Sequence, residues 1–459
     1  MAGKSQTGNF NMCGIFGIWN HEHGLEYCLL SLHALQHRGQ EGTGISFLED
    51  QTISTVKDQK LVSELSKKQK LKNKRSKSAI GHIRYATAGN NSKENVQPFD
   101  ARLECTDLAV AHNGNLTNHI RLRKDLIHSG SLFQSSSDTE LFLHLIAKSD
   151  NITLPEKIQD ACRQVEGAYS LIFLSKDCMV GVRDPKGFRP LFLGEVDNSY
   201  ILSSETCAFE LTGAKFIREI QPGEMVVVKN TGFTLSQALE KEERKFCIFE
   251  LVYFSRPDSI FNSESIYEIR KRMGGQLAKE YTPGVDYVIP VPDSGMPAAL
   301  GYSQASGIPF ELGISRNHYV GRTFIDSDIG IRALSLKMKH NPNENILRGK
   351  RILMIDDSIV RGSTSKNLIN LLKSYGVAEI HLGITSPPYI SPCFYGIDTP
   401  TKNELIASHN SPEEIKQTLG VDSLHYLSIE GLYSSTGRDF GFCSACFTEE
   451  YPTDVRDLL

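Results

Sequence analysis

The chain has 459 residues, of which 40% are hydrophobic and 23% charged, and its formal net charge is −4 at pH 7. This length predicts two domains, and this composition is typical of a soluble globular protein. The small net charge gives no electrostatic reason to expect a nucleic acid or a membrane surface as a partner. No apolar run approaches the length of a transmembrane helix and residues 1–12 have no signal-peptide core, so we expect a cytoplasmic protein.

The first apolar stretch begins at Cys13, after the polar residues 1–12. We expect those residues to be a leader that is removed, either by cleavage or by translation from Met12 followed by loss of that methionine. An N-terminal cysteine carries its own base, because its α-amine titrates near pH ~7.7–8 and can take the thiol proton directly or through a water. The alternative is a buried cysteine at the head of a core strand.

The remainder of the first half is rich in short strands and has few helices. An amphipathic helix is predicted over residues 25–37, and further helices over 118–129 and 139–149. The predicted strands cover residues 44–48, 79–85, 108–112, 168–174, 179–183, 200–203 and 224–228. This pattern predicts two stacked sheets flanked by helices.

Three polar clusters, at residues 82–87, 112–115 and 137–140, are expected where strands end. An amide substrate needs an arginine for its carboxylate, a carboxylate for its ammonium group and an oxyanion hole. Asn113 and the backbone N–H of Gly114 could form that hole. The alternative is a set of separate turns with a helix N-cap at Ser137 or Asp138.

The order of the motifs along the chain is that of a known family. The motifs are these three clusters, the stretch at residues 13–17 and His37-Arg38-Gly39-Gln40. Together they resemble the N-terminal-nucleophile glutamine amidotransferases. The resemblance covers residues 13–242 and implies an α+β domain, the αββα sandwich of N-terminal-nucleophile hydrolases. It implies that Cys13 attacks the glutamine carboxamide to form a γ-glutamyl thioester and release ammonia. Asn113 and Gly114 would stabilise the oxyanion, Arg84 would bind the substrate carboxylate, and Asp138 its ammonium group.

From Cys247 onward, strands and helices alternate. Continuous apolar runs at residues 287–291, 351–355 and 379–385 predict buried parallel strands, and residues 297–306 and 365–375 predict helices. Ligands in such sheets bind beyond the carboxyl ends of the strands. Asp356 and Asp357 at one such end can hold ribose hydroxyls or a hard cation, and the loop that follows opens a helix and favours a phosphate. A strand, turn and helix with aspartate caps is the alternative.

Residues 355–364 resemble the phosphoribosyl-pyrophosphate signature of the type I phosphoribosyltransferases, an α/β fold with a parallel sheet, and residues 292–295 resemble their pyrophosphate loop. The resemblance implies one Mg²⁺ per subunit, bound by Ser294, Asp356 and Asp357, the two aspartates also facing the ribose. It implies that the 5′-phosphate is cradled by Ser358, Ile359, Val360, Arg361, Gly362, Ser363 and Thr364, and that the pyrophosphate loop consists of Asp293, Ser294 and Gly295.

The basic, glycine-containing connection at residues 316–341 is long for a compact domain and predicts a lid. Its closure would shield the reactive sugar carbon from water and place positive charge over the diphosphate, with Arg322 as a substrate-binding residue. A disordered surface loop is the alternative.

The spacing of Cys443 and Cys446 fits a zinc half-site, a redox pair or part of an iron–sulfur site, and does not choose among them. Both halves together resemble the amidophosphoribosyltransferase family, and the cysteine-containing segments resemble its iron–sulfur subclass. That resemblance implies one structural [4Fe–4S] cluster per subunit, ligated by Cys247, Cys393, Cys443 and Cys446. It also implies feedback inhibition by purine nucleotides and a homotetramer.

The expected organisation is a leader (1–12), a glutamine amidotransferase domain (13–242) and a phosphoribosyltransferase domain with a C-terminal cluster-binding segment (243–459). The implied reaction converts glutamine, water and phosphoribosyl pyrophosphate into 5-phosphoribosylamine, glutamate and pyrophosphate, the first committed step of purine synthesis, with ammonia channelled from Cys13 to the second site. Glucosamine-6-phosphate synthase and asparagine synthetase are alternative functions within the amidotransferase group. Neither explains the signature at residues 356–364. A sensor of phosphoribosyl pyrophosphate, the other alternative, has no use for an ammonia source.

Overall fold

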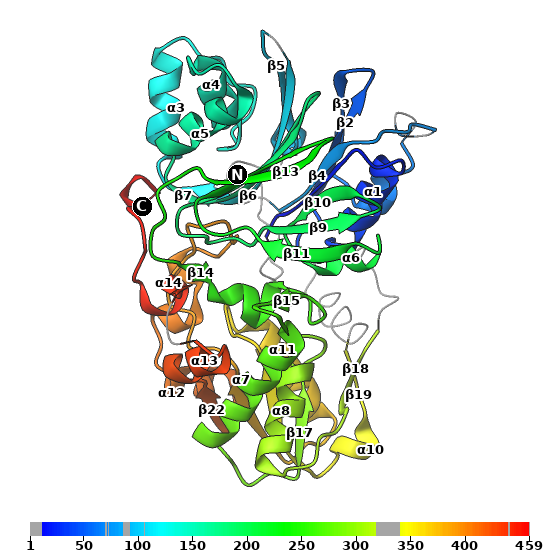
Figure 1. Ribbon diagram of the computed structural model, residues 1–459. Helices are drawn as coiled ribbons and strands as arrows, with labels where there is room; N and C mark the ends of the chain where they lie inside the picture. Colours follow the sequence, from blue (N-terminus) through cyan, green and yellow to red (C-terminus); the bar gives the residue numbers. More distant parts are fainter. Residues whose placement is uncertain are drawn as a thin grey trace.

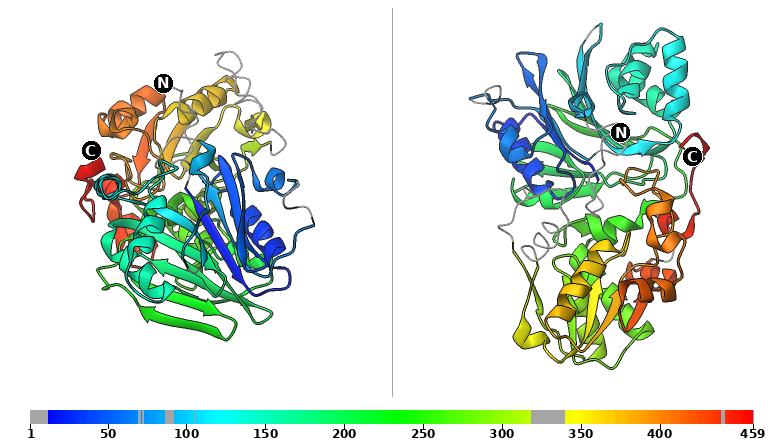
Figure 2. Two further views of the ribbon diagram at one scale, coloured as in Figure 1. Left: turned by 90° about the horizontal axis from the view of Figure 1, so that it is seen from above. Right: turned by 180° about the vertical axis from the view of Figure 1, so that it is seen from behind.

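The computed structural model describes residues 12–68, 71, 73–85, 92–104, 106–317, 340–438 and 441–458. The chain forms two stacked halves, and the segment after the last α-helix runs back along the side of the first half (Figure 1). The view from behind shows the same division (Figure 2). Within these ranges, no helix combines the length and the apolar character needed to cross a membrane.

The first half contains two antiparallel sheets. The seven-stranded sheet has the order β11-β9-β10-β1-β4-β2-β3 and the six-stranded sheet the order β13-β12-β8-β7-β6-β5. The strands of the first sheet are β1 (Gly14–Trp19), β2 (Gly42–Glu49), β3 (Thr52–Asp58), β4 (Ala79–Arg84), β9 (Phe192–Val196), β10 (Ser199–Ser203) and β11 (Lys215–Glu219). Those of the second are β5 (Phe99–Arg102), β6 (Asp107–Leu116), β7 (Gly167–Ser175), β8 (Met179–Arg183), β12 (Glu224–Lys229) and β13 (Gly232–Gln237).

Helices cover the outer faces of both sheets, while the inner faces share a core that includes Ile15, Ile172 and Leu202. Helix α1 (Gly24–Ala34) packs on the first sheet, and α3 (His119–His128), α4 (Glu140–Lys148) and α5 (Leu154–Gln164) lie on the second. This arrangement confirms the predicted αββα sandwich. Helix α5 was not predicted, because its residues LPEKIQDACRQ are mostly polar and only one face is buried.

One prediction about the polar clusters is wrong, and one of the alternatives does not hold. His112, Asn113 and Asn115 lie inside β6 and pair with β7, so they do not follow the end of a strand. Their side chains are buried between the sheets and the helices, which is why a hydrophobic pattern did not reveal the full strand. Asp138 is not an N-cap either: α4 begins after Thr139, and the Asp138 carboxylate accepts a hydrogen bond from the backbone of β6.

The second half contains a parallel sheet with the order β17-β20-β21-β22. Its strands are β17 (Tyr287–Pro290), β20 (Arg351–Asp356), β21 (Glu379–Ile384) and β22 (Ser423–Tyr426). One face packs on α7 (Ile266–Glu280) and α8 (Met296–Ser306), and the other on α11 (Ser363–Ser374) and α12 (Pro412–Leu419). The predicted α/β domain with a parallel sheet is therefore confirmed, with β22, α7 and α12 added.

Short strands and helices complete the two halves. Strand β14 (Phe246–Cys247) pairs in parallel with β23 (Phe442–Cys443), although almost two hundred residues separate them in sequence. The other short elements are α2 (Val62–Leu65), η1 (Lys93–Asn95), α6 (Cys207–Glu210), the π-helix η2 (Glu250–Phe254), β15 (Ile260–Phe261), β16 (Glu264–Ser265), β18 (Ile314–Arg316), β19 (His340–Pro342), α10 (Glu344–Leu347), η3 (Lys402–Glu404), η4 (Ile406–Ser408), α13 (Ile429–Ser435), α14 (Ala445–Thr448) and η5 (Arg456–Leu458).

Candidate functional site

Cys13 lies at the head of β1 and is almost fully buried. Its thiol points to the carbonyl oxygen of Tyr85, 3.6 Å away at the end of β4. Burial raises the pKa of Cys13, while the Tyr85 contact and the charge of Arg84 act in the opposite direction. A thiol with a raised pKa needs a base to become a nucleophile.

The backbone N–H of Gly114 points toward the same site. Alternate N–H groups of a strand face the same edge. On β6, the N–H of His112 donates to Gln97 Oε1 at 2.7 Å and the N–H of Leu116 donates to Asp138 Oδ2 at 2.9 Å, both away from β7. Gly114 lies between them in an unbroken register with β7. The N–H of Gly114 therefore faces the same edge as Asp138. Asp138 lies close enough to Cys13 to raise the pKa of that thiol.

The side chain of Asn113 is fully buried and connects the two sheets. Its Nδ2 lies 3.4 Å from the hydroxyl of Ser204, just after β10, and that hydroxyl accepts the N–H of Ile15 at 3.0 Å. Asn113 Oδ1 has no hydrogen-bond partner in the described part of the chain. Because Ser204 already accepts one hydrogen bond, its own proton suits an amide oxygen, and a turn of the amide would leave the Asn113 NH₂ group facing the site.

Arg84 and Asp138 complete this group of buried residues. Burial lowers the pKa of Arg84, whereas interactions with Cys13, Glu41 and Asp138 oppose that shift. The structure thus brings together all five residues expected at the glutamine site: Cys13, Arg84, Asn113, Gly114 and Asp138. A guanidinium and a carboxylate beside a cysteine suit a substrate that carries both an α-carboxylate and an α-ammonium group.

A buried ion-pair network, which the sequence analysis did not identify, lies behind Cys13. Arg38 Nε donates to the carbonyl oxygen of Cys13 at 2.9 Å, and the same guanidinium pairs with Glu205 and with Glu250. Arg189 also pairs with Glu250, at 3.4 Å. Glu250 belongs to η2, so the network joins the backbone of the cysteine to the second half of the chain.

Glu205→Gln is expected to lower stability by about 3–5 kcal/mol at neutral pH, because it removes one charge of a buried pair. Burial alone would raise the pKa of Glu205, but His37 and Arg38 outweigh it and hold the pKa well below its ordinary value of 4.5. The stabilisation is therefore complete above about pH 4.5 and is lost as the pH falls below it. The difference in Tm between wild type and variant should accordingly shrink in acid.

The matched control is Glu242→Gln, which removes a half-exposed partner of Lys186. It should cost about 1 kcal/mol or less. A Tm difference for Glu205→Gln that stays constant from about pH 7 down to about pH 3.5 would contradict the assigned role of the network, since linkage requires it to change.

The second candidate site lies at the carboxyl ends of β17 and β20. The N–H of Val291 donates to the carbonyl oxygen of Ile355 at 2.8 Å, which holds the two ends together. A Cβ added to Gly295 would lie 2.3 Å from that oxygen, so only glycine lets the Asp293–Gly295 loop approach β20. The hydroxyl of Ser294 lies 3.5 Å from Asp356 Oδ1. The two predicted loops therefore form one site.

Asp356 and Asp357 present adjacent carboxylates at that site. Burial raises the pKa of Asp356 well above its ordinary value, and the charge of Asp357 raises it further. The Asp357 carboxylate accepts the hydroxyl of Ser358 at 2.6 Å. Residues 358–362 then lead into α11, which begins after Gly362 in a left-handed conformation (φ +73°). The two carboxylates can bind a cation. The N-terminus of the helix beside them can bind a phosphate.

Two residues near this aspartate pair were not identified from the sequence. The pKa of Tyr253, in η2, is raised by burial and then by Asp357 and Asp356. Burial lowers the pKa of Arg270, in α7, to about 10, while Asp357 opposes the shift. Neither belongs to a local motif. Arg361 pairs with Glu404 at 2.9 Å. Arg322, with residues 318–339 of the predicted lid, lies outside the described residues.

The four cysteines predicted as cluster ligands lie together at the junction of the halves. Cys247 and Cys443 are paired in register on β14 and β23, and the N–H of Tyr395 donates to Cys393 Sγ at 3.3 Å. Burial raises the pKa of Cys446 well above its ordinary value, and the thiols of Cys247, Cys443 and Cys393 raise it further. All four are free of disulfides.

The chemistry of this group is that of four soft thiols. Among the described residues, no group of three or more His, Cys, Asp or Glu side chains is arranged to hold a single metal ion. The ligands of a four-iron cluster are spread around a larger body, and four soft thiols with N–H donors are the set that such clusters use. Arg189 supplies a buried positive charge near Cys247 and Cys393.

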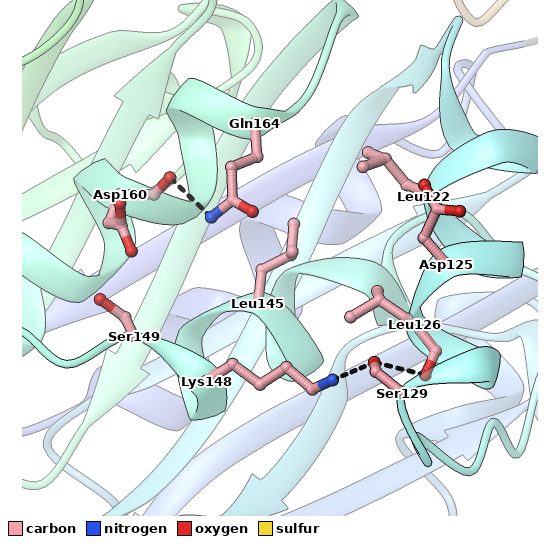
Figure 3. Close-up of a pocket in the computed structure, with 9 residues that line it drawn as sticks. All are labelled: Leu122, Asp125, Leu126, Ser129, Leu145, Lys148, Ser149, Asp160 and Gln164. Carbon is pink, nitrogen blue, oxygen red and sulfur yellow. Dashed lines mark hydrogen bonds between the residues drawn. The ribbon is translucent and has the colours of Figure 1, made fainter.

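An open groove of about 350 Å³ lies elsewhere, between α3, α4 and α5 (Figure 3). Leu122, Leu126 and Leu145 form its apolar part, and Lys148 reaches across to Ser129. None of the predicted site residues lines it, and it contains no cysteine or histidine.

Comparisons with known proteins agree with this division. A family model described as a glutamine amidotransferase domain matches residues 82–210, and one described as a phosphoribosyl transferase domain matches residues 258–386. The amidophosphoribosyltransferase of Bacillus subtilis is 44% identical over 449 residues, covering 96% of this chain and 94% of the relative. Amidophosphoribosyltransferase 2 of Arabidopsis thaliana, a chloroplast protein, is 47% identical and covers 96% and 79% of the two chains.

Solved structures give the same result. The glutamine phosphoribosylpyrophosphate amidotransferase of B. subtilis, complexed with ADP and GMP, superposes with a TM-score of 0.92 at 44% identity and covers 96% of this chain and 98% of that one. A structure described as the allosteric regulatory enzyme of purine biosynthesis gives a TM-score of 0.93 at 44% identity, over 96% and 97% of the chains.

Proposed function

The chain belongs to the amidophosphoribosyltransferase family, and we propose that Cys13 and the Asp356–Thr364 loop are its two reaction centres. As a member of that family it is an enzyme of the first step of purine biosynthesis, a glutamine amidotransferase and phosphoribosyltransferase. The observation that carries the assignment of the centres is the convergence of Cys13, Arg84 and Asp138 in a chain whose other half places two aspartates at a strand end.

In the glutamine half, the reaction follows from the positions of the side chains. After removal of residues 1–12, the α-amine of Cys13 takes the thiol proton, and the sulfur attacks the carboxamide carbon. The oxygen that becomes negative is stabilised by the N–H of Gly114 and the amide of Asn113, which Ser204 holds in place. The α-ammonium then protonates the leaving nitrogen, ammonia departs, and water hydrolyses the thioester to glutamate.

In the phosphoribosyl half, the ammonia passes internally to the second site and attacks C1 of the sugar, and pyrophosphate leaves. The 5′-phosphate is held at the N-terminus of α11 by the backbone of residues 358–364. The carboxylates of Asp356 and Asp357 and the hydroxyl of Ser294 would hold one Mg²⁺ per subunit. When bound, that ion offsets the charge of the diphosphate. Arg316, paired with Asp293, adds positive charge at the mouth of the loop.

We further propose the iron–sulfur subclass, with one [4Fe–4S] cluster per subunit held by Cys247, Cys393, Cys443 and Cys446. Such a cluster would cross-link β14, β23 and the loop at Cys393. Burial lowers the pKa of Arg189, but Cys247 and Cys393 outweigh this and raise it, so the guanidinium stays charged and balances anionic ligands. The role is structural, because the reaction has no redox step.

Cys446→Ser is expected to reduce bound iron from about four atoms per chain to near zero and to lower the Tm, because metal binding is coupled to folding. The measurement is iron and acid-labile sulfide in protein purified without oxygen. Cys178→Ser is the matched control: this cysteine is also buried, and its Sγ lies 3.5 Å from Ser175 Oγ. Unchanged iron in Cys446→Ser, or equal loss in Cys178→Ser, would contradict the ligand assignment.

One relative bears on the expected regulation. A B. subtilis relative was solved with ADP and GMP, which supports feedback inhibition by purine nucleotides here. The homotetramer and the cytoplasmic location stay predictions.

The function is tested by turnover of protein purified anaerobically, with intact-mass analysis of its N-terminus. Glutamine and phosphoribosyl pyrophosphate should give 5-phosphoribosylamine with glutamate and pyrophosphate in equal amounts, from a chain that begins at Cys13. Stoichiometric binding of phosphoribosyl pyrophosphate without turnover would instead indicate a sensor.

A further inference from the structure

Four consecutive residues of the second half, 394–397, pack directly on the strands that carry the glutamine site. Ile397 forms an antiparallel bridge with Met12, the residue before Cys13. The side-chain amide of Asn115, one residue beyond Gly114, donates to the carbonyl oxygen of Phe394 at 2.9 Å. The segment thus contacts both the nucleophile strand and the oxyanion strand.

From these contacts we infer that residues 394–397, and Gly396 above all, position the oxyanion hole of the glutamine site. The inference rests on the proposed roles of Cys13 and Gly114. Gly396 has no side chain and lies against the backbone of Gly114, so it is a positioning residue that acts through Gly114.

The backbones of Gly396 and Gly114 are in direct contact. A Cβ added to Gly396, whose φ is +103°, would lie 2.8 Å from the carbonyl carbon of Gly114, 2.9 Å from its Cα and 3.0 Å from its oxygen. All three atoms are backbone, so no side-chain rotation can relieve the overlap. A residue larger than glycine at 396 must therefore displace either its own segment or Gly114.

Gly114 has little room to move. A Cβ on Gly114 would lie only 2.0 Å from the carbonyl oxygen of Ala168 and 2.8 Å from His112 Nε2. The strand is thus confined between β7 on one side and Gly396 on the other. Because the Gly114 N–H points to the edge where Asp138 and Cys13 lie, a push from Gly396 changes the position of the oxyanion donor.

The 394–397 segment is itself held firmly. Arg189 donates from Nε and Nη2 to the carbonyl oxygen of Tyr395, at 2.8 and 2.6 Å. The ring of Tyr395 stacks on Phe188, with centroids 4.3 Å apart and planes 15° apart, and the Tyr395 hydroxyl meets Thr453 Oγ1 at 3.0 Å. An alanine at 396 therefore transmits its overlap to Gly114 and is not absorbed by movement of the segment.

Oxyanion donors act only when they lie within about 2.7–3.1 Å of the developing charge. A displacement of a few tenths of an ångström weakens the stabilisation of the transition state by the Gly114 N–H. It leaves the binding of the ground-state substrate through Arg84 and Asp138 intact. Gly396→Ala should therefore lower kcat for glutamine by about 10- to 100-fold. The KM for glutamine and the ammonia-dependent rate should change by less than about twofold.

Two probes of Cys13 separate positioning from general damage. L-glutamate γ-semialdehyde accepts the Cys13 sulfur at its aldehyde carbon: a C–S bond forms, the carbonyl π bond breaks, and the oxygen takes the negative charge in the oxyanion hole. Iodoacetamide alkylates the same sulfur by displacing iodide and needs no such hole. In Gly396→Ala, the apparent Ki of the semialdehyde should rise by the factor lost in kcat, while alkylation by iodoacetamide proceeds at the wild-type rate.

The matched control is Gly349→Ala, at a residue with φ +69° where an added Cβ meets nothing within 4 Å. It also places an alanine at a positive φ, but without a neighbour to displace. Equal kcat values for the two variants would overturn the inference. A fall in kcat accompanied by a comparable rise in the KM for glutamine and a comparable fall in the rate of alkylation by iodoacetamide would also overturn it. Failure of the proposed function is recognised separately, because wild type would then show no glutamine turnover sensitive to alkylation, and the inference would fall with it.

Discussion

Cys13→Ser is expected to lower glutamine-dependent formation of 5-phosphoribosylamine by about 10⁴-fold or more, because the nucleophile of the thioester step is lost. Product formation from added ammonium chloride should remain within about twofold of wild type, because the second site lies in the other half of the chain. The measurement compares pyrophosphate release with the two nitrogen sources in the same preparation.

The control for this substitution is Cys178→Ser, at a buried cysteine whose Sγ already lies 3.5 Å from Ser175 Oγ. It should retain both activities. If Cys13→Ser lost both activities while folding and iron content were normal, the scheme of two separate sites would be wrong.

Asp357→Asn is expected to lower product formation from glutamine and from ammonia alike, by about 10²–10³-fold. The asparagine keeps the shape of the side chain but removes a negative charge from the pair that would hold the cation beside the sugar. Glutaminase activity at Cys13 should persist, so glutamate should form without an equal amount of pyrophosphate. The two substitutions together therefore assign each half-reaction to one half of the chain.

Asp422→Asn is the matched control, since Asp422 accepts the N–H of Ile380 at 2.7 Å at the amino end of the same sheet, away from the strand ends that carry the loops. It should lower neither activity by more than about twofold. A selective loss of the glutamine-dependent rate in Asp357→Asn would place this carboxylate in the wrong half-reaction.

The parts of the site that could be predicted from sequence are contiguous. Residues 356–364 and 293–295 form two short loops, and each loop carries its own chemical pattern. The parallel strands that precede them are continuous apolar runs, which are recognisable without tertiary information. Glutamine-site residues such as Cys13 and Asn113 are far apart in sequence. Without the structure, only the order of the family motifs indicated that they belong to one site.

The residues that were missed act through partners far away in the chain. Ser204 reaches Asn113 and Ile15, and Glu205 reaches Arg38, yet both are ordinary polar residues after a strand. Tyr253 and Arg270 come close to the aspartate pair only because η2 and α7 pack beneath it. Strand β6 was predicted too short because its polar side chains find buried partners, which a hydrophobic pattern does not register.

The contact between Gly396 and Gly114 also bears on the order of events during synthesis. Gly396 leaves the ribosome 282 residues after Gly114, which at about 5–20 residues per second is roughly 15–60 s later. Throughout that interval, the first half lacks the 394–397 segment that packs on β6 beside Gly114. The packing around the glutamine site is therefore completed only after most of the domain that consumes the ammonia has been made.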